Sequence, residues 1–152
     1  LRKYKIPVDE SLIRICDTRE DAIVVTPEFL QMEDRPDAFF AINDESAVGI
    51  LYAVKQAGLK VPDDVSIFGF SNGRFALASD PMLSTVEQHG FEMGKNAAKL
   101  LISKIKGETQ GQFTNKIIKT NTFFVDGSVL HLLYNTLIIP KNSDSLFKQS
   151  FG

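Results

Sequence analysis

Short apolar runs alternate with helical patterns along the middle of the chain. Three of these runs, at 12–16, 37–42 and 65–70, have the composition of buried β-strands, and shorter strands are expected at 83–87 and 116–125. Continuous apolar strands separated by helices are typical of a parallel sheet covered on both faces. The pattern therefore predicts an α/β fold of three layers, with helices on both sides of a parallel sheet.

The helix between the second and third strands is the clearest element. Asn43 or Asp44 can cap its first turn, and apolar residues then recur at helical spacing from Ala47 to Val54. Gly58 follows the helix and can adopt the left-handed backbone conformation that commonly ends one. The sequence therefore predicts a helix that begins directly where the second strand ends.

Two further helices are expected on either side of it. Residues 91–106 place their apolar side chains on one face, and Gly107 ends the pattern. The segment 19–32 also suits a helix, but it contains Pro27. Because proline lacks the N–H that an interior turn needs, this segment is either a kinked helix or a shorter one that begins at Thr26.

The composition is that of an ordinary globular protein and narrows the function classes. The 152 residues are 43% apolar and carry 17 basic against 19 acidic side chains, a net charge of −2. A free-standing nucleic-acid-binding domain usually has a basic surplus, which is missing here. The single cysteine, Cys16, excludes an internal disulfide, and no apolar run approaches the roughly 18 residues of a membrane span. Residues 1–6 lack the features of a signal peptide, so we expect a piece of a longer protein.

Compact polar pairs follow the three main strands. In a parallel α/β sheet, ligands bind outside the carboxyl ends of the strands. Arginine, asparagine and aspartate can hold vicinal hydroxyls or a carboxylate through paired hydrogen bonds. The alternative is that these residues only cap helices, and the pattern leaves both interpretations open. The candidates for a shared site for a small polar ligand are Arg14, Asp17, Asn43, Asp44, Ser71 and Asn72.

A second interpretation makes Ser71 a nucleophile. The residues Gly69-Phe-Ser-Asn-Gly73 match the G-x-S-x-G elbow of serine hydrolases and follow a strand. The base and acid would be His89 with Asp80, which follow closely, or His131 with Asp126. The alternative is a turn whose glycines permit a sharp exit from the strand.

Metal and cofactor sites are not predicted. Cys16, His89 and His131 are too scattered for a zinc spacing, and the glycines of 90–96 lack both the length and the hydroxyl residue of a phosphate loop. If the chain binds a small polar ligand and is not a hydrolase, we therefore expect no catalytic residue, no metal and no cofactor.

Several motifs in fixed order resemble the LacI/GalR family of bacterial transcription regulators. The segment Arg35-Pro-Asp-Ala-Phe-Phe-Ala-Ile-Asn-Asp-Glu-Ser-Ala-Val-Gly49 is similar to the family pattern P-D-A-x-F-A-x-N-D-x-x-A-x-G. The similarity continues through 56–70, 80–88 and 92–101. Residues 121–128 are similar to the family's closing strand, although Asp126 stands where arginine is usual.

The resemblance implies a type I periplasmic-binding-protein-like domain that is incomplete. Residues 1–128 would be a partial effector-binding domain, followed by an appendage over 129–152 with no family counterpart. Within it, 1–87 would be most of the C-terminal lobe, 88–118 elements of the N-terminal lobe, and 119–128 a returning strand.

The resemblance also implies partners. The longer protein would be a cytoplasmic homodimer that binds operator DNA through an N-terminal helix-turn-helix outside this chain. A small effector, such as a sugar or a nucleobase, would change that DNA affinity. A solute-binding protein of an importer shares the fold and is the alternative.

Family contacts can be placed on matching residues. Asn43 and Arg14 match positions that often meet the effector, and Gln88 lies near the crossover between lobes. Ser71 stands where the family usually has aspartate, which puts hexose recognition in doubt. Leu51 is better explained as core. The dimer contacts implied by the resemblance are Val48, Tyr52, Phe75 and Leu77.

Overall fold

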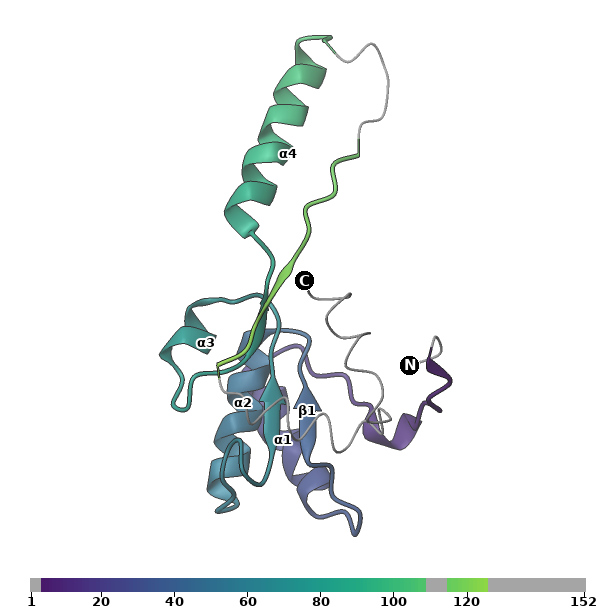
Figure 1. The fold of residues 1–152 in the computed structure, drawn as a ribbon, viewed down its shortest axis with the longest axis vertical. Coiled ribbons are helices and arrows are strands. Elements are labelled where there is room, and N and C mark those ends of the chain that lie inside the picture. Colours follow the sequence, from purple (N-terminus) through teal and green to yellow (C-terminus); the bar gives the residue numbers. More distant parts are fainter. Residues whose placement is uncertain (1–3, 109–114, 126–152) are drawn as a thin grey trace, which may run out of the picture.

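The computed structural model describes residues 4–108 and 115–125 (Figure 1). All predicted helices and strands except the first strand form in the expected order, and the α/β class is confirmed. The elements are the short 3-10 helix η2 (Glu10–Leu12), α1 (Arg19–Leu30), β1 (Ala38–Phe40), α2 (Asp44–Gln56), β2 (Ser66–Phe68), α3 (Arg74–Ala78), β3 (Thr85–Glu87), α4 (Gly90–Ile105) and β4 (Asn121–Phe123).

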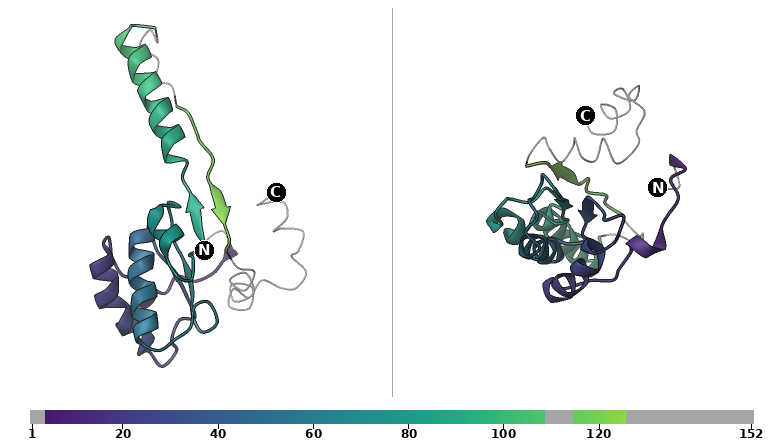
Figure 2. Two further views of the ribbon diagram at one scale, coloured as in Figure 1. Left: turned by 90° about the vertical axis from the view of Figure 1, so that its left-hand side faces the viewer. Right: turned by 90° about the horizontal axis from the view of Figure 1, so that it is seen from below.

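The strands form a row in which parallel and antiparallel pairs meet. β1 pairs with β2 in parallel, with Phe39 opposite Ile67, and β3 pairs with β4 in antiparallel register. A parallel bridge between Phe68 and Ser84 joins the two pairs. Helices α1 and α2 pack on one side of β1 and β2 (Figure 2).

The core lies between this helix pair and the sheet. Leu51 and Val54 of α2 are 4% and 0% exposed, and Ile67 of β2 is 2% exposed. A Cβ added to Gly49 would collide with the backbone oxygen of Arg19, so glycine is what lets α1 and α2 approach so closely. The core therefore depends on this contact between α1 and α2.

Helix α1 runs through Pro27 without ending, so of the two alternatives left open by the sequence, the shorter helix that begins at Thr26 is wrong. Thr18 caps the helix: its side chain accepts a hydrogen bond from Asp21 N, and the Asp21 carboxylate accepts one from Thr18 N. Beyond the proline, Gln31 N donates to the Pro27 carbonyl at 3.2 Å. Proline removes one backbone donor, and the capping box and the packing against α2 hold the remaining turns.

The first predicted strand does not form. Residues 13–17 have extended backbone after η2, but they pair with no strand among the described residues. The last strand, predicted over 116–125, is shorter than expected and consists of the three residues of β4. Strand composition alone is insufficient because a strand needs a hydrogen-bonded neighbour, and residues 13–17 have none among the described residues.

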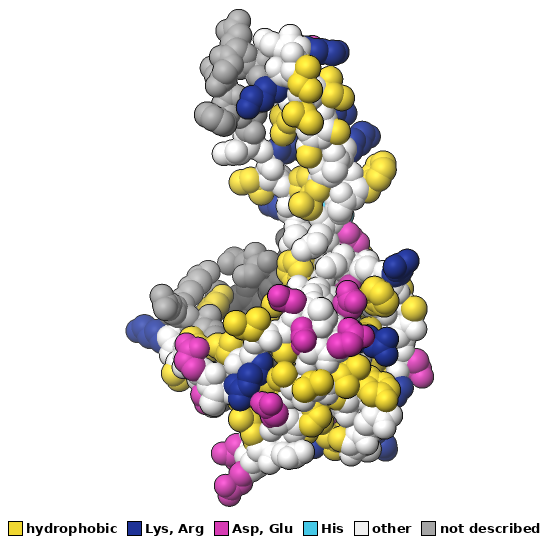
Figure 3. Space-filling view, turned by 180° about the vertical axis from the view of Figure 1, so that it is seen from behind, with side chains coloured by type: hydrophobic (Ala, Val, Ile, Leu, Met, Phe, Trp, Pro, Cys, Tyr) yellow, Lys and Arg dark blue, Asp and Glu magenta, His cyan; other side chains and the backbone are white. Residues whose placement is uncertain are grey.

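Helix α4 stands apart from the rest of the described chain (Figure 1). It has no buried residue, and Phe91, Leu101 and Ile105 are 87%, 59% and 76% exposed. Figure 3 shows apolar side chains along it, interspersed with basic ones. A helix with an apolar face of this size needs a partner surface to cover it.

Candidate functional site: the strand-end cluster

Asn43 ties the first strand-like segment to the start of α2. Its Oδ1 accepts a hydrogen bond from Ser46 N at 2.7 Å, which caps the helix. Its Nδ2 donates to the Asp17 carbonyl at 3.1 Å. One side chain therefore serves both as a cap and as a bridge, and the two strand ends that carry Asp17 and Asn43 lie together.

Asp44 joins three further elements from a buried position. The residue is 3% exposed. Its Oδ1 accepts from Thr85 Oγ1 at 2.6 Å, and its Oδ2 accepts from Gly73 N at 2.7 Å. Protein donors therefore engage both oxygens of the Asp44 carboxylate in this conformation. That Asp44 contacts a ligand stays a prediction.

Asn72 links the third strand end to β3. Its backbone adopts a left-handed conformation, with φ of 53°. Its N donates to Thr85 Oγ1 at 3.2 Å, and its Nδ2 donates to Glu87 Oε2 at 2.7 Å. The carboxylate of Glu87 also accepts from His89 N at 2.7 Å. The side chain of Asn72, followed by this backbone N–H, lowers the pKa of Glu87 below its ordinary value.

Glu87 therefore lies beside the candidate residues at the third strand end, although the sequence did not single it out. The available signal was its place at the end of a strand, directly before Gln88. Its neighbour in space is Ser71, which forms a parallel bridge with it and donates its N–H to the Val86 carbonyl at 2.9 Å. Ser71 has a φ of 131°, a conformation that L-residues rarely adopt.

Three polar side chains at these strand ends keep their hydrogen-bonding capacity. Among residues 4–108 and 115–125, the Ser71 hydroxyl, the Asp17 carboxylate and the Gln88 amide form no side-chain hydrogen bond with another residue. Asp17 is exposed, and Ser71 and Gln88 are half-buried. The strand-end cluster is defined from here on as Asp17, Asn43, Ser71, Asn72 and Gln88.

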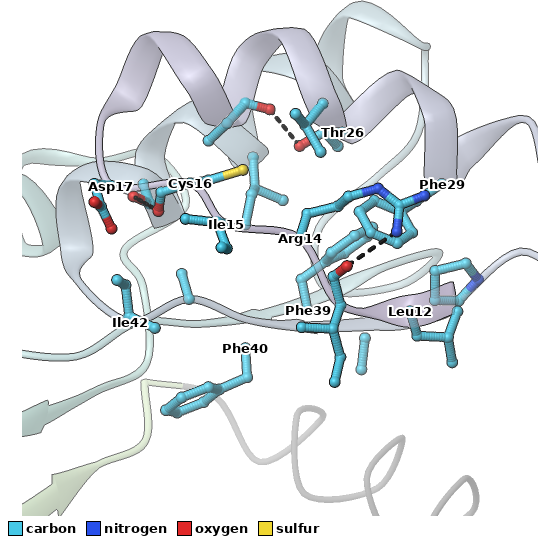
Figure 4. Close-up of a pocket in the computed structure, with 18 residues that line it drawn as sticks. Leu12, Arg14, Ile15, Cys16, Asp17, Thr26, Phe29, Phe39, Phe40 and Ile42 are labelled. Carbon is cyan, nitrogen blue, oxygen red and sulfur yellow. Dashed lines mark hydrogen bonds between the residues drawn. The ribbon is translucent and has the colours of Figure 1, made fainter. Parts of the chain in front are cut away.

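Arg14 does not join this cluster. Its Nη1 donates to the carbonyls of Ser11 and Ile13, each at 2.9 Å, and its Nε reaches Glu28 at 3.4 Å. The guanidinium lies 5.1 Å from the centre of the Phe29 ring. Figure 4 shows Arg14 reaching toward Phe29 and away from Asp17. The Arg14 guanidinium is therefore engaged beside the last turns of α1, and its contact with a ligand stays a prediction.

A cavity of about 470 Å³ separates residues 12–17 from β1 (Figure 4). Its walls are mostly apolar and include Phe29, Phe39 and Phe40. Cys16 also lines it, and burial, followed by the charge of Asp21, raises the pKa of the Cys16 thiol. With its mostly apolar walls, the cavity resembles a gap in the sheet more than a polar binding site.

The hydrolase interpretation finds no support in the described residues. No hydrogen bond there joins the Ser71 hydroxyl to a histidine or a carboxylate, and the backbone of His89 is engaged with Glu87. His131 and Asp126 lie outside the described residues. A serine nucleophile needs a base within hydrogen-bond reach.

The surface residues assigned to a dimer contact are mostly exposed. Tyr52, Phe75 and Leu77 are 46%, 41% and 62% exposed, and Val48 is half-buried against the core. Leu51 belongs to the core, as predicted. This surface, defined by Val48, Tyr52, Phe75 and Leu77, is called the α2–α3 surface below.

Metal-ligating clusters and membrane-spanning helices are both absent from the described residues. Within this part of the chain, no three His, Cys, Asp or Glu side chains gather where they could hold a metal ion. Its helices are also all too short or too polar to cross a membrane.

Comparison with known proteins decides the family. The periplasmic binding protein-like domain matches residues 2–122. The chain belongs to the LacI/GalR family of effector-binding domains. It is 36% identical over 110 residues to the HTH-type transcriptional repressor PurR of Vibrio atlanticus (strain LGP32), a match that covers 70% of this chain and 32% of the repressor. It is 39% identical over 110 residues to the arabinose metabolism transcriptional repressor of Geobacillus stearothermophilus, covering 69% of this chain and 30% of that protein.

A solved structure agrees with this assignment to the LacI/GalR family. The LacI family transcriptional regulator from Enterococcus faecium, with bound ribose, superposes with a TM-score of 0.66 at 29% identity. The match covers 71% of this chain and 39% of the regulator. The chain thus spans about a third of the length of the curated relatives it matches. Both of those relatives are repressors.

Proposed function

We propose that this chain is the ligand-sensing portion of a LacI/GalR-type transcription regulator. The effector would be a small polar molecule, a sugar or a nucleobase-like compound, bound at the strand-end cluster. The observation that carries the proposal is how hydrogen bonds are distributed within the cluster. The side chains of Asn43 and Asn72 hydrogen-bond to other protein groups and hold the strand ends together. The side chains of Asp17, Ser71 and Gln88 form no hydrogen bond with another described residue and can bind a ligand.

The chemistry of these three side chains suits a hydroxyl-rich or amide-bearing ligand. The Asp17 carboxylate accepts hydrogen bonds, and the Ser71 hydroxyl and the Gln88 amide each donate and accept. Ser71 adds no charge at the position where the resemblance leads us to expect aspartate. The ribose bound to the E. faecium regulator supports the sugar class.

The position of Gln88 supports a mechanism in which effector binding brings two lobes of the longer protein together. Gln88 lies in the short connection between β3 and α4, so a ligand held by Gln88 and Ser71 would contact the point where the chain leaves the main body. The exposed apolar face of α4 supports its assignment, with the rest of 88–118, to a second lobe completed by other residues of the longer protein. An effector that contacts both lobes stabilises the closed arrangement by its differential affinity.

Effector binding would change the affinity of the longer protein for DNA. In the longer protein, a helix-turn-helix outside this chain would bind operator DNA, and the α2–α3 surface would contribute to a cytoplasmic homodimer. Closure of the lobes would shift the operator affinity through coupling between the two sites.

Titration calorimetry on the longer protein tests the binding step. A panel of pentoses, hexoses, nucleosides and nucleobases identifies the effector class. Ser71→Ala and Gln88→Ala should each weaken binding about tenfold, as expected from the loss of about 1.4 kcal/mol per hydrogen bond. Gln56→Ala, on the exposed end of α2, is the matched control and should bind normally. Equal affinity in all three variants would remove the strand-end cluster from the site.

A further inference from the structure

Helices α1, α2 and α4 all begin at the edge of the sheet where the strand-end cluster lies. Each follows the end of a strand, or of the extended segment 13–17, by a few residues. β1, β2 and β3 run in parallel, so their carboxyl ends share this edge. Because the first backbone N–H groups of a helix are unpaired and its dipole is positive there, such an edge is an ordinary place for a phosphate or a carboxylate to bind.

In this chain, uncharged side chains of the protein already cap α1 and α2. Thr18 Oγ1 accepts a hydrogen bond from Asp21 N at 3.1 Å, and Asn43 Oδ1 accepts one from Ser46 N at 2.7 Å. An anion that bound either helix start would therefore compete with a cap that the chain itself supplies.

Two carboxylates accept further backbone donors along the same edge. Asp44 Oδ2 accepts from Gly73 N at 2.7 Å in the loop before α3, and Glu87 Oε1 accepts from His89 N at 2.7 Å directly before α4. Each of these carboxylates places a negative charge where an incoming anion would need a donor. A second anion at either position would be repelled by the first.

Acidic side chains outnumber basic ones around these helix starts. Residues 14–21, 43–46, 71–75 and 87–92 contain seven carboxylates, three arginines and no lysine. Figure 3 shows acidic side chains grouped on the main body, just below the place where α4 joins it. The edge therefore carries an excess of negative charge. The carboxylates belong to Asp17, Glu20, Asp21, Asp44, Glu45, Glu87 and Glu92.

The three arginines offer little to an anion in the strand-end cluster. Arg14 is engaged by Glu28 and by backbone carbonyls, and the Arg74 guanidinium lies 5.4 Å from the centre of the Phe75 ring. Arg19 is exposed and shares the first turn of α1 with two acidic residues. Sites for phosphate or carboxylate are usually built from arginine or lysine side chains, and the cluster itself contains neither.

We propose that the strand-end cluster selects its effector by charge: it accepts uncharged polar molecules and rejects phosphorylated and carboxylated ones, and Asp17 contributes most to this discrimination. The inference rests on the proposed function and narrows its effector class to unphosphorylated sugars, nucleosides and nucleobases. Asp17 is the exposed carboxylate of the cluster, and among the described residues no donor or cation pairs with its side chain.

Titration calorimetry on the longer protein compares four parent compounds with their own phosphate esters: D-ribose, D-glucose, D-galactose and adenosine. A parent that binds should bind at least about tenfold more tightly than its phosphate ester. Because salt screens the repulsion between charges, raising the ionic strength from about 0.05 to about 0.5 M should narrow this difference. A difference caused only by the size of the phosphate group would stay the same.

Asp17→Asn separates charge from shape, since asparagine is nearly the same size. In this variant the ratio between the affinities for parent and phosphate ester should fall about threefold or more. Asp80→Asn is the matched control. It removes an equal charge from a fully exposed side chain near Lys55, in the last turn of α2, and should leave the ratio unchanged.

The outcomes separate the charge selection from the proposed function. A phosphate ester that binds as tightly as its parent, or an Asp17→Asn ratio equal to that of the unsubstituted protein, would overturn the charge selection and leave the proposed function standing. If none of the eight compounds binds, the proposed function fails and the charge selection fails with it.

Discussion

Asp44 at the start of α2 accepts a 2.6 Å hydrogen bond from Thr85 at the start of β3, although 41 positions separate them in the chain. The same carboxylate accepts from Gly73 N, and Thr85 Oγ1 in turn accepts from Asn72 N. This small network fixes three chain segments at the edge of the sheet where the strand-end cluster lies. It explains how polar residues distant in sequence are held in one place.

Thr85→Val should destabilise the chain by about 1 to 3 kcal/mol, because it leaves a buried Asp44 oxygen without its donor. Chemical denaturation measures the free energy of unfolding. Thr122→Val, on the neighbouring strand β4, is the control and should change it far less. If the two variants unfold alike, the Asp44 carboxylate does not depend on Thr85.

Gly49→Ala should cost about 1 to 3 kcal/mol, since the added methyl group would press on the Arg19 carbonyl and on Ala22 and force α1 away from α2. Gly94→Ala is the matched control: a Cβ there meets nothing within 4 Å, and alanine should stabilise helix α4 by up to about 1 kcal/mol. Thermal unfolding should therefore shift in opposite directions. Equal shifts would contradict the close approach of the two helices.

Glu87 should make stability depend on pH in the acid range. Its pKa is lowered in the folded chain, chiefly by Asn72, so the folded state favours the carboxylate. This contribution is present above the ordinary carboxyl pKa of about 4.3 and is lost as the pH falls through the lowered folded value. Glu87→Gln should be less stable at neutral pH and should lose less on acidification.

Denaturation at neutral pH and below pH 4 measures this difference, with the exposed Glu33→Gln as the control. The Glu87 account fails if Glu87→Gln and the unsubstituted chain lose equal stability on acidification.

The α2–α3 surface should control dimerisation of the longer protein. Tyr52→Asp or Leu77→Asp places a charge on an exposed apolar side chain, and we expect the dimer to weaken about tenfold or more in sedimentation equilibrium. Val24→Asp, exposed on α1, is the control. Dimers of normal strength in both α2–α3 variants would place the contact elsewhere.

Local patterns were enough to predict the elements that local interactions stabilise. Asn43 caps α2 as expected, and Gly58 follows the helix with a φ of 76°. The first strand failed because its formation depends on a neighbouring strand, which composition cannot supply. Pro27 was ambiguous because packing of α1 against α2 decides whether the helix continues.

The sequence was enough to place polar residues after the strands, but it could not predict the hydrogen-bond partners of each. Asn43 and Asp44 are adjacent and both can cap a helix, and only the fold shows that one is half-buried and the other enclosed. Arg14 is drawn to Glu28 and Phe29, which lie on another element. Glu87 was missed because its partner Asn72 is 15 positions away.

The most direct test is the operator affinity of the longer protein with and without the effector found by calorimetry. The account predicts that the effector changes operator affinity, and that Ser71→Ala needs about tenfold more effector for the same change while its effector-free operator affinity stays normal. An operator affinity that no member of the sugar and nucleobase panel alters, or a Ser71→Ala protein that responds at unchanged effector concentration, would contradict it.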